Sequence, residues 1–274
     1  MSDFTVPLNR DRLSVLVATV LLLSALFRFI QVPEAAWNLQ VLGSPLEVRL
    51  TGTFLLVVLT IALVVAGTRY VLYSHPPVSK GLPRPTYTSW VLPGLLVGLA
   101  TYVVHLAPSI PLWSAGVMLV GFLVGVSVSA EFIALSTQDP RYTRARLALN
   151  LLAYLLAFTL FYIIYQLRAR SLITATMTTL LSFLVALDLL SVADVGVGRV
   201  ALFSGIVGLV VGEATWVLNY WRLSNWVGAF IILLVFYVAS GIAHQHLLER
   251  LSKRVMAEFL LITIVALSVL LFAS

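Results

Sequence analysis

Long apolar runs separated by short polar segments follow one another along the whole chain. Nine of them can be distinguished, at about residues 13–32, 51–73, 90–107, 111–136, 147–167, 171–192, 199–222, 225–248 and 255–272. About 20 apolar residues in a helix are enough to cross the ~30 Å hydrocarbon layer of a bilayer. The pattern therefore predicts an all-α fold, a polytopic bundle of about nine transmembrane helices that forms a single domain over residues 1–274.

Three of the connections carry information of their own. In residues 33–50, apolar and polar residues alternate on both sides of Gly43-Ser44-Pro45, which predicts a short hairpin or an interfacial cap. Residues 75–89 hold four of the eleven prolines and form the longest expected flexible connection. The third and fourth runs are joined only by Pro108-Ser109-Ile110, so the pattern leaves open whether both cross the bilayer fully.

The composition indicates that the solvent of this chain is lipid. Hydrophobic residues make up 61% of the chain and charged residues 10%, whereas an ordinary soluble domain is about 25% charged. The formal charge of +6 does not indicate nucleic-acid binding, because the basic residues stand at the ends of the apolar runs, where membrane proteins keep them. The chain has no cysteine, which excludes disulfides and thiolate metal sites.

The distribution of arginine and lysine predicts the orientation. With nine spans and the N-terminus inside, the inner segments carry more of these residues than the outer segments, as the positive-inside rule requires. We therefore expect a multi-pass protein of a bacterial-type cytoplasmic membrane with its N-terminus in the cytoplasm. Membrane lipids are its expected partners, together with further membrane proteins or other copies of the chain.

Glu213 is the leading candidate for a functional residue. It lies between Arg199 and Arg222 in the seventh apolar run, and at about 1.5 Å of rise per residue this places its carboxylate well inside the hydrocarbon layer. A carboxylate is costly against lipid and is by default functional there. We therefore expect Glu213 to be buried inside the bundle, either as a proton, cation or substrate site or as a structural contact between helices.

Other polar and small residues share the sector of the helical wheel that contains Glu213. At about 100° per residue this sector holds Gly205, Gly208, Gly212, Trp216 and Asn219. Trp216 and Asn219 are predicted to line a pocket beside Glu213. Arg28, near the end of the first run, is the predicted partner of Glu213, with the alternative that its side chain extends to the membrane surface.

A second group of polar residues stands near the opposite ends of the spans. It consists of Glu131, Asp188, His244 and Glu258. These residues fit an inner vestibule or proton relay, in which His244 would titrate near neutral pH. Side chains at the level of the lipid headgroups would give the same pattern. His244 and His246 are two residues apart, about 200° on a helix, and cannot chelate one metal ion together, so no metal site is expected.

The sequence supports two functions of different classes. The first is binding or transport of a small polar or amphiphilic solute through a site around Glu213, with possible proton coupling. The alternative is a non-catalytic structural subunit of a larger membrane complex. An enzyme ranks third, because the chain contains no metalloprotease, phosphatase or Gly-rich phosphate-binding motif, and we expect no catalytic residues and no cofactor.

The C-terminal third carries the one resemblance to known proteins. The segment EATWVLNYWRLSNWVGAFIILLVFYVASGIAHQHLLERLSKR, within residues 200–260, resembles an uncharacterised family of bacterial multi-spanning membrane proteins. The resemblance implies an all-helical membrane fold. It implies no activity and assigns no functional residue.

Overall fold

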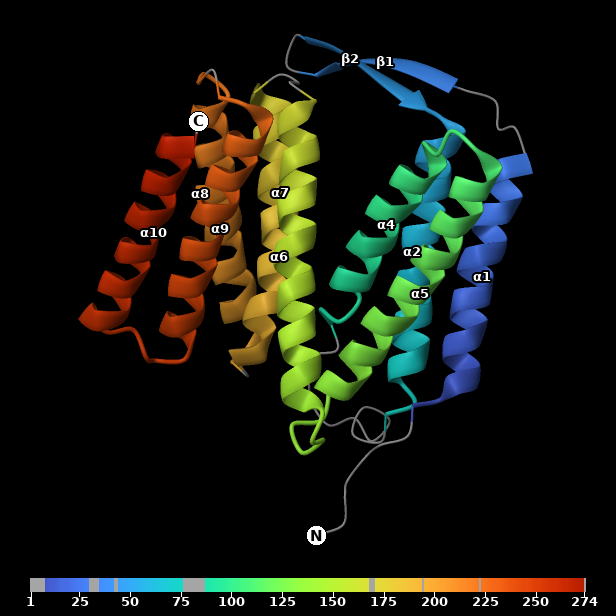
Figure 1. The fold of residues 1–274 in the computed structure, drawn as a ribbon, viewed down its shortest axis with the longest axis horizontal. Coiled ribbons are helices and arrows are strands. Elements are labelled where there is room, and N and C mark those ends of the chain that lie inside the picture. Colours follow the sequence, from blue (N-terminus) through green and yellow to red (C-terminus); the bar gives the residue numbers. More distant parts are fainter. Residues whose placement is uncertain are drawn as a thin grey trace. The chain divides into compact units, whose positions relative to one another are not determined.

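The computed structural model of the chain describes residues 8–29, 35–41, 44–75, 87–167, 171–193, 195–221 and 223–273. Within these residues, nine α-helices coincide with the nine apolar runs, and one β-hairpin joins the first two (Figure 1). The elements are α1 (Arg10–Phe29), β1 (Ala35–Val41), β2 (Ser44–Leu50), α2 (Gly52–Leu72), α4 (Val91–His105), α5 (Ile110–Ala134), α6 (Tyr142–Gln166), α7 (Ser171–Leu190), α8 (Val197–Leu218), α9 (Asn225–Leu247) and α10 (Lys253–Ala273).

The hairpin that the alternating pattern predicts is present. Strands β1 and β2 pair antiparallel, with Ala35 opposite Leu50 and Val41 opposite Ser44. The nine helices within the described residues confirm the helical fold class, to which this two-stranded sheet is an addition. The longest predicted connection, residues 75–89, lies mostly outside the described residues.

Seven helices within the described residues are long and apolar enough to cross a membrane: α1, α2, α5, α6, α7 with the 3-10 turn that follows it, α8 and α9. Helix α4 has 15 residues, fewer than the roughly 20 needed to span the hydrocarbon layer. The structure thus supports membrane insertion. The count of nine spans, the cytoplasmic N-terminus and the type of membrane stay predictions.

The chain divides into two compact units, residues 1–149 and 150–274, with the boundary inside α6. Each unit is described by itself below. The prediction that both belong to a single domain stays a prediction.

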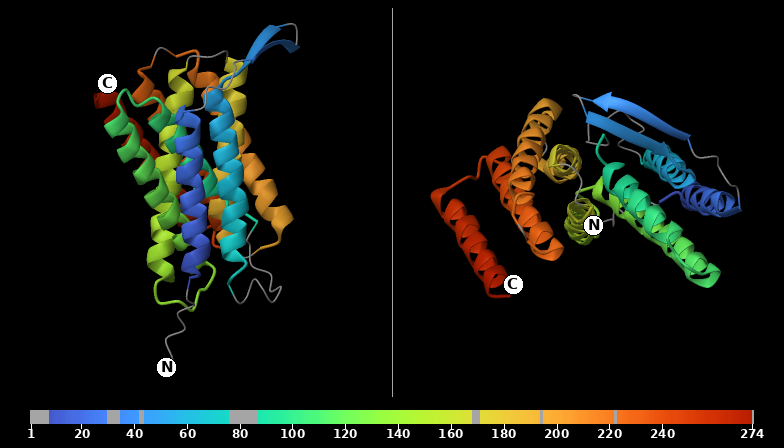
Figure 2. Two further views of the ribbon diagram at one scale, coloured as in Figure 1. Left: turned by 90° about the vertical axis from the view of Figure 1, so that its right-hand side faces the viewer. Right: turned by 90° about the horizontal axis from the view of Figure 1, so that it is seen from above.

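In the first unit, α1, α2, α4 and α5 pack side by side, α1 against α2 and α5, and α4 between α2 and α5 (Figure 2). Its core contains Val20, Val64, Val97 and Val124, none of which is exposed. Some glycines let neighbouring side chains approach closely; a Cβ on Gly98, for example, would come within 2.7 Å of the end of the Ile61 side chain, which would have to move. Close packing through small residues is the usual basis of helix association in lipid.

The second unit is organised around the contact between α7 and α8, its most extensive helix pair. A Cβ on Gly208 would meet the Thr179 carbonyl oxygen at 2.8 Å, and a Cβ on Gly212 would come still closer to the Thr179 side chain. Helix α9 packs on α8, and α10 packs on α9 at the edge of the unit (Figure 2). The second half of α6 joins α9 through aromatic contacts such as Phe161 with Phe236, whose ring centroids are 5.9 Å apart.

The close approach of α7 and α8 predicts opposite effects of the same substitution at two glycines. Gly208→Ala should lower stability by about 1–3 kcal/mol, because the new methyl group must push the helix backbones apart. Gly205→Ala is the matched control, since a Cβ there has nothing within 4 Å, and alanine should stabilise the helix by up to about 1 kcal/mol. Thermal unfolding of the two variants in detergent measures the difference. Equal melting temperatures would contradict the packing.

Candidate functional site

Glu213 is exposed in the structure. The prediction that its carboxylate is buried inside the bundle is therefore wrong. Glu213 is followed by only five further residues of α8, which ends at Leu218, so it lies about 7–8 Å from the end of the helix.

The reason for the error is the width of the sector on the helical wheel. The buried face of α8 contains Ser204, Gly208, Val211 and Thr215. Nine residues separate Ser204 from Glu213, which at about 100° per residue puts the two on opposite sides of the helix. The glycines at one edge of the predicted sector pack on α7, while Glu213 at its other edge points away from the unit.

The predicted pocket residues beside Glu213 do not form an enclosed site. Trp216 is 47% exposed, and its indole Nε1 donates a hydrogen bond of 3.3 Å to the Tyr220 hydroxyl. Asn219 is half-buried and caps the C-terminus of α8, where its backbone N–H donates to the Thr215 carbonyl at 3.0 Å. Tryptophan and tyrosine at a helix end are typical of the membrane–water interface.

Arg28 belongs to the first unit and Glu213 to the second, so their pairing stays a prediction. The Arg28 side chain is exposed, and its guanidinium lies 5.9 Å from the centre of the Trp113 ring. This distance is within the range of a cation–π interaction. Arg28 therefore has a contact within its own unit.

The residues of the predicted inner relay lie in different surroundings. Glu131, 2% exposed, is in the first unit, whereas Asp188, 1% exposed, and the half-buried His244 are in the second. Glu258 is exposed on α10, where it forms an ion pair of 3.4 Å with Arg254 one helical turn away. Such an exposed pair contributes little to stability. A relay through all four residues stays a prediction.

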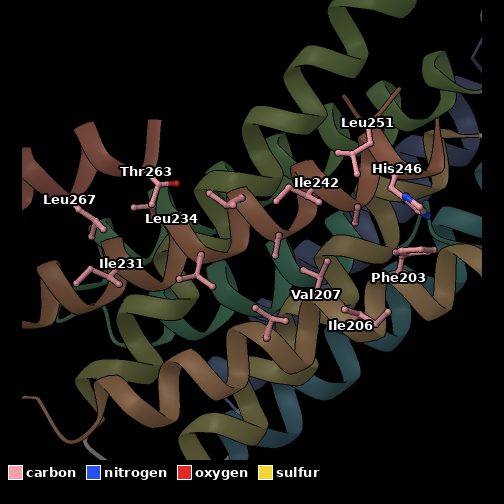
Figure 3. A pocket seen from close by; sticks show the side chains of 15 residues that line it. Phe203, Ile206, Val207, Ile231, Leu234, Ile242, His246, Leu251, Thr263 and Leu267 are labelled. Carbon is pink, nitrogen blue, oxygen red and sulfur yellow. The ribbon is translucent and has the colours of Figure 1, made fainter. Parts of the chain in front are cut away.

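The second unit contains a large apolar cleft between α8, α9 and α10 (Figure 3). Its volume is about 580 Å³, within the range of small-molecule sites. The lining consists of Phe203, Ile206, Val207 and Val210 from α8; Ile231, Leu234, Val235, Val238, Ala239, Ile242, Ala243 and His246 from α9; and Leu251, Thr263 and Leu267. Glu213 does not line it.

The cleft is elongated and has polar character at one end. It follows α9 from Ile231 to His246, a distance of about 22 Å at the rise of an α-helix. His246 lies at the end where α9 terminates, with its ring centroid 5.1 Å from that of Phe203. The Thr263 hydroxyl on the opposite wall already donates to the Phe259 carbonyl oxygen at 2.8 Å. His246 is therefore the lining side chain best placed to meet a polar group.

The turn after α9 holds this end of the cleft in shape. The Arg250 N–H donates to the Gln245 carbonyl and the Glu249 N–H to the His246 carbonyl, both at 3.0 Å, which is the Schellman pattern of a helix end. Glu249 takes the left-handed conformation, φ 57°, that this pattern needs and that glycine usually provides. Leu251 follows directly and lines this end of the cleft.

A family model described as "Protein of unknown function (DUF5656)" matches residues 32–273. The chain belongs to the DUF5656 family. No curated protein and no solved structure matches it. The resemblance to an uncharacterised family is confirmed, and the match extends far beyond residues 200–260, although it bears neither on a bacterial origin nor on a multi-spanning nature of the family.

The part of the chain that the DUF5656 match covers contains the whole cleft and Glu213. Arg28 lies before the first matched residue. The predicted partner of Glu213 is thus outside the segment by which this chain belongs to the family.

An ion pair with a buried carboxylate in this DUF5656 protein was missed by the sequence reasoning. Asp139, in the turn between α5 and α6, is 3% exposed at its side chain and forms an ion pair of 3.1 Å with Arg141. Its Oδ1 also accepts a hydrogen bond of 2.8 Å from the Arg141 N–H. His75, beyond the end of α2 and 1% exposed, packs edge-on against Phe132 of α5, 4.9 Å between ring centroids. The tripeptide Asp139-Pro140-Arg141 was the only feature of the sequence that could have indicated this ion pair.

Hydrogen bonds from the Arg141 side chain hold the pKa of Asp139 below its ordinary value, against the opposing effect of burial and with a smaller contribution from His75. A lowered carboxyl pKa means that the folded state binds the ionised form more strongly than the unfolded chain does. The stabilisation is therefore complete above the ordinary aspartate pKa of ~3.9. It is lost as the pH falls through the lower pKa of the folded state.

Asp139→Asn should accordingly lower the melting temperature at pH 7 and have a smaller effect near pH 3. We expect a loss of about 1 kcal/mol at neutral pH, because charge-assisted hydrogen bonds exceed neutral ones while the half-exposed Arg141 is screened by solvent. Thermal unfolding from pH 3 to 7 checks this, with Asp11→Asn on the exposed start of α1 as the control. A difference between wild type and Asp139→Asn that does not change with pH would contradict the ion pair.

Proposed function

We propose that this membrane protein binds an amphiphilic molecule with a long hydrocarbon part in the cleft between α8, α9 and α10. The observation that carries the proposal is an apolar cleft of about 580 Å³ with one titratable side chain, His246, at its end. An elongated apolar volume favours a chain-like ligand over a compact polar one, because a polar solute would lose its water without gaining hydrogen bonds. Of the predicted small polar or amphiphilic solutes, the proposal keeps the amphiphilic ones, and it places their binding site in this cleft and not around Glu213.

The dimensions of the cleft support an extended hydrocarbon chain. Its length of about 22 Å along α9 exceeds the ~15 Å thickness of one hydrocarbon leaflet. A ligand whose hydrocarbon part lies between Ile231 and Ile242 would place its polar end beside His246, which can donate a hydrogen bond to it. Movement of this ligand across the membrane, with or without a proton, would be a further step beyond binding.

Filling the cleft tests the proposal. Ala239→Phe, on the α9 wall, should weaken binding of a fluorescent fatty acid to the purified protein at least tenfold, because the added ring occupies the volume of the hydrocarbon chain. His246→Phe should weaken binding of the carboxylate probe by about two- to tenfold, the value of one hydrogen bond. It should leave binding of a long-chain hydrocarbon without a polar end unchanged. Fluorescence titration in detergent measures each affinity.

The matched control is Leu209→Phe, which adds a ring to an exposed position of α8 outside the cleft lining. It should bind the probe like the wild type. Equal affinity of Ala239→Phe and the wild type, with unchanged melting temperatures, would rule out this cleft as the binding site.

A second candidate function rests on the exposed glutamate. Leu202, Ile206, Leu209, Glu213 and Trp216 form an exposed stripe on α8 at the spacing of one helix face. A charge on such a face is unfavourable in lipid, and contact with a polar group of another protein would relieve that cost. This favours the alternative of a structural subunit, in the specific form of an assembly with other copies of the chain.

The absence of cysteine makes this candidate testable by single-cysteine cross-linking. Leu209→Cys on the stripe should give a covalent dimer when isolated membranes are oxidised, and Glu213→Gln in the same chain should reduce its yield. Leu261→Cys, equally exposed on α10, is the control and should remain monomeric. Dimer formation at both positions to the same extent, or at neither, would contradict association through α8.

A further inference from the structure

The first unit contains a second groove, formed by α5 with the beginnings of α1 and α6. Its volume is about 580 Å³. It follows α5 from Gly121 to Ile133, about 18 Å at the helical rise, which is close to the ~15 Å thickness of one hydrocarbon leaflet. The small residues Gly125 and Ser129 leave room for the groove, and Phe122 lines it near the far end.

Two arginines stand at one end of this groove. Arg141, in the turn, and Arg144, in the first turn of α6, both line it. They are three residues apart and therefore lie on the same side of the chain. Arg141 is 52% exposed at its side chain although it pairs with Asp139. The Arg144 side chain is exposed and makes no hydrogen bond or ion pair with the residues that the structure describes.

The electrostatics of this end favour an anion. The positive end of the α6 helix dipole lies beside the two guanidinium groups, because α6 begins at Tyr142. Arg141 and Arg144 carry two positive charges and Asp139 one negative charge, which leaves a net charge of +1. A guanidinium group can donate two parallel hydrogen bonds to the oxygens of one phosphate. The groove thus combines an apolar channel about as long as a leaflet with a positively charged end.

We propose that this groove holds an anionic phospholipid, with an acyl chain along α5 and the phosphate at Arg141 and Arg144. The site is independent of the cleft between α8, α9 and α10, since the two share no residue. A zwitterionic lipid fits the apolar channel equally well but brings no net charge to the arginines. The preference for a negative headgroup is therefore the property that distinguishes this site from ordinary contact with the bilayer.

Arg144→Gln is the decisive variant, because it removes one charge without breaking the ion pair of Asp139. Native mass spectrometry of the delipidated protein, titrated with palmitoyl-oleoyl phosphatidylglycerol, should show about fivefold weaker binding of the first lipid, the effect of one arginine near an anionic headgroup. Binding of the corresponding phosphatidylcholine should not change. Arg69→Gln, an exposed arginine near the end of α2 that does not line the groove, is the matched control and should bind both lipids like the wild type.

Ala130→Phe provides a second test within the apolar channel. It should weaken the binding of both lipids. Its melting temperature shows whether the variant is folded. If it is unfolded, the binding measurements on Arg144→Gln alone test the proposal. The proposal is overturned if Arg144→Gln and Arg69→Gln weaken phosphatidylglycerol binding equally, or if neither does. It is also overturned if inorganic phosphate displaces the lipid at millimolar concentration, since the site would then recognise a free anion.

Discussion

The constraint on which this structure depends is that lipid offers no hydrogen bonds to the chain. Backbone groups are therefore paired inside helices, and the same constraint governs the polar side chains between them. The hydroxyls of Ser24, Thr60, Thr178 and Thr215 are buried, and each donates to the carbonyl oxygen four residues earlier in its own helix. These four hydroxyls are thus satisfied within their own helices and take no part in joining neighbouring helices, so the contacts between helices depend strongly on shape.

Shape acts mainly through glycine. Where α7 meets α8, the Thr179 backbone and side chain occupy the space that side chains at positions 208 and 212 would need. This contact fixes the rotation of α8 and thereby turns Glu213 and Trp216 outward. The position of the acidic residue follows from the packing of its glycine neighbours, and the charge itself has no part in placing α8 against α7.

The two candidate sites are similar in shape but differ in their polar groups. Both combine an elongated apolar volume with polar groups at one end, which is the form of an amphiphile. In the cleft of the second unit the polar end is a histidine that can donate or accept a hydrogen bond. In the groove of the first unit it is a pair of arginines next to a helix start, which favours a negative charge. The difference in headgroup chemistry gives each site its own expected ligand.

The sequence by itself determined the helices, because runs of about 20 apolar residues have one stable form in lipid. It also determined the hairpin after the first helix, through alternation around Gly43-Ser44-Pro45. Only the tertiary structure decided which side of each helix is buried, since adjacent residues such as Gly212 and Glu213 differ by about 100° and a helix that is apolar all round has no marked face. The cleft and the proximity of His75 to Asp139 were likewise beyond the sequence, because the cleft depends on how side chains of three helices pack and the proximity joins turns far apart along the chain.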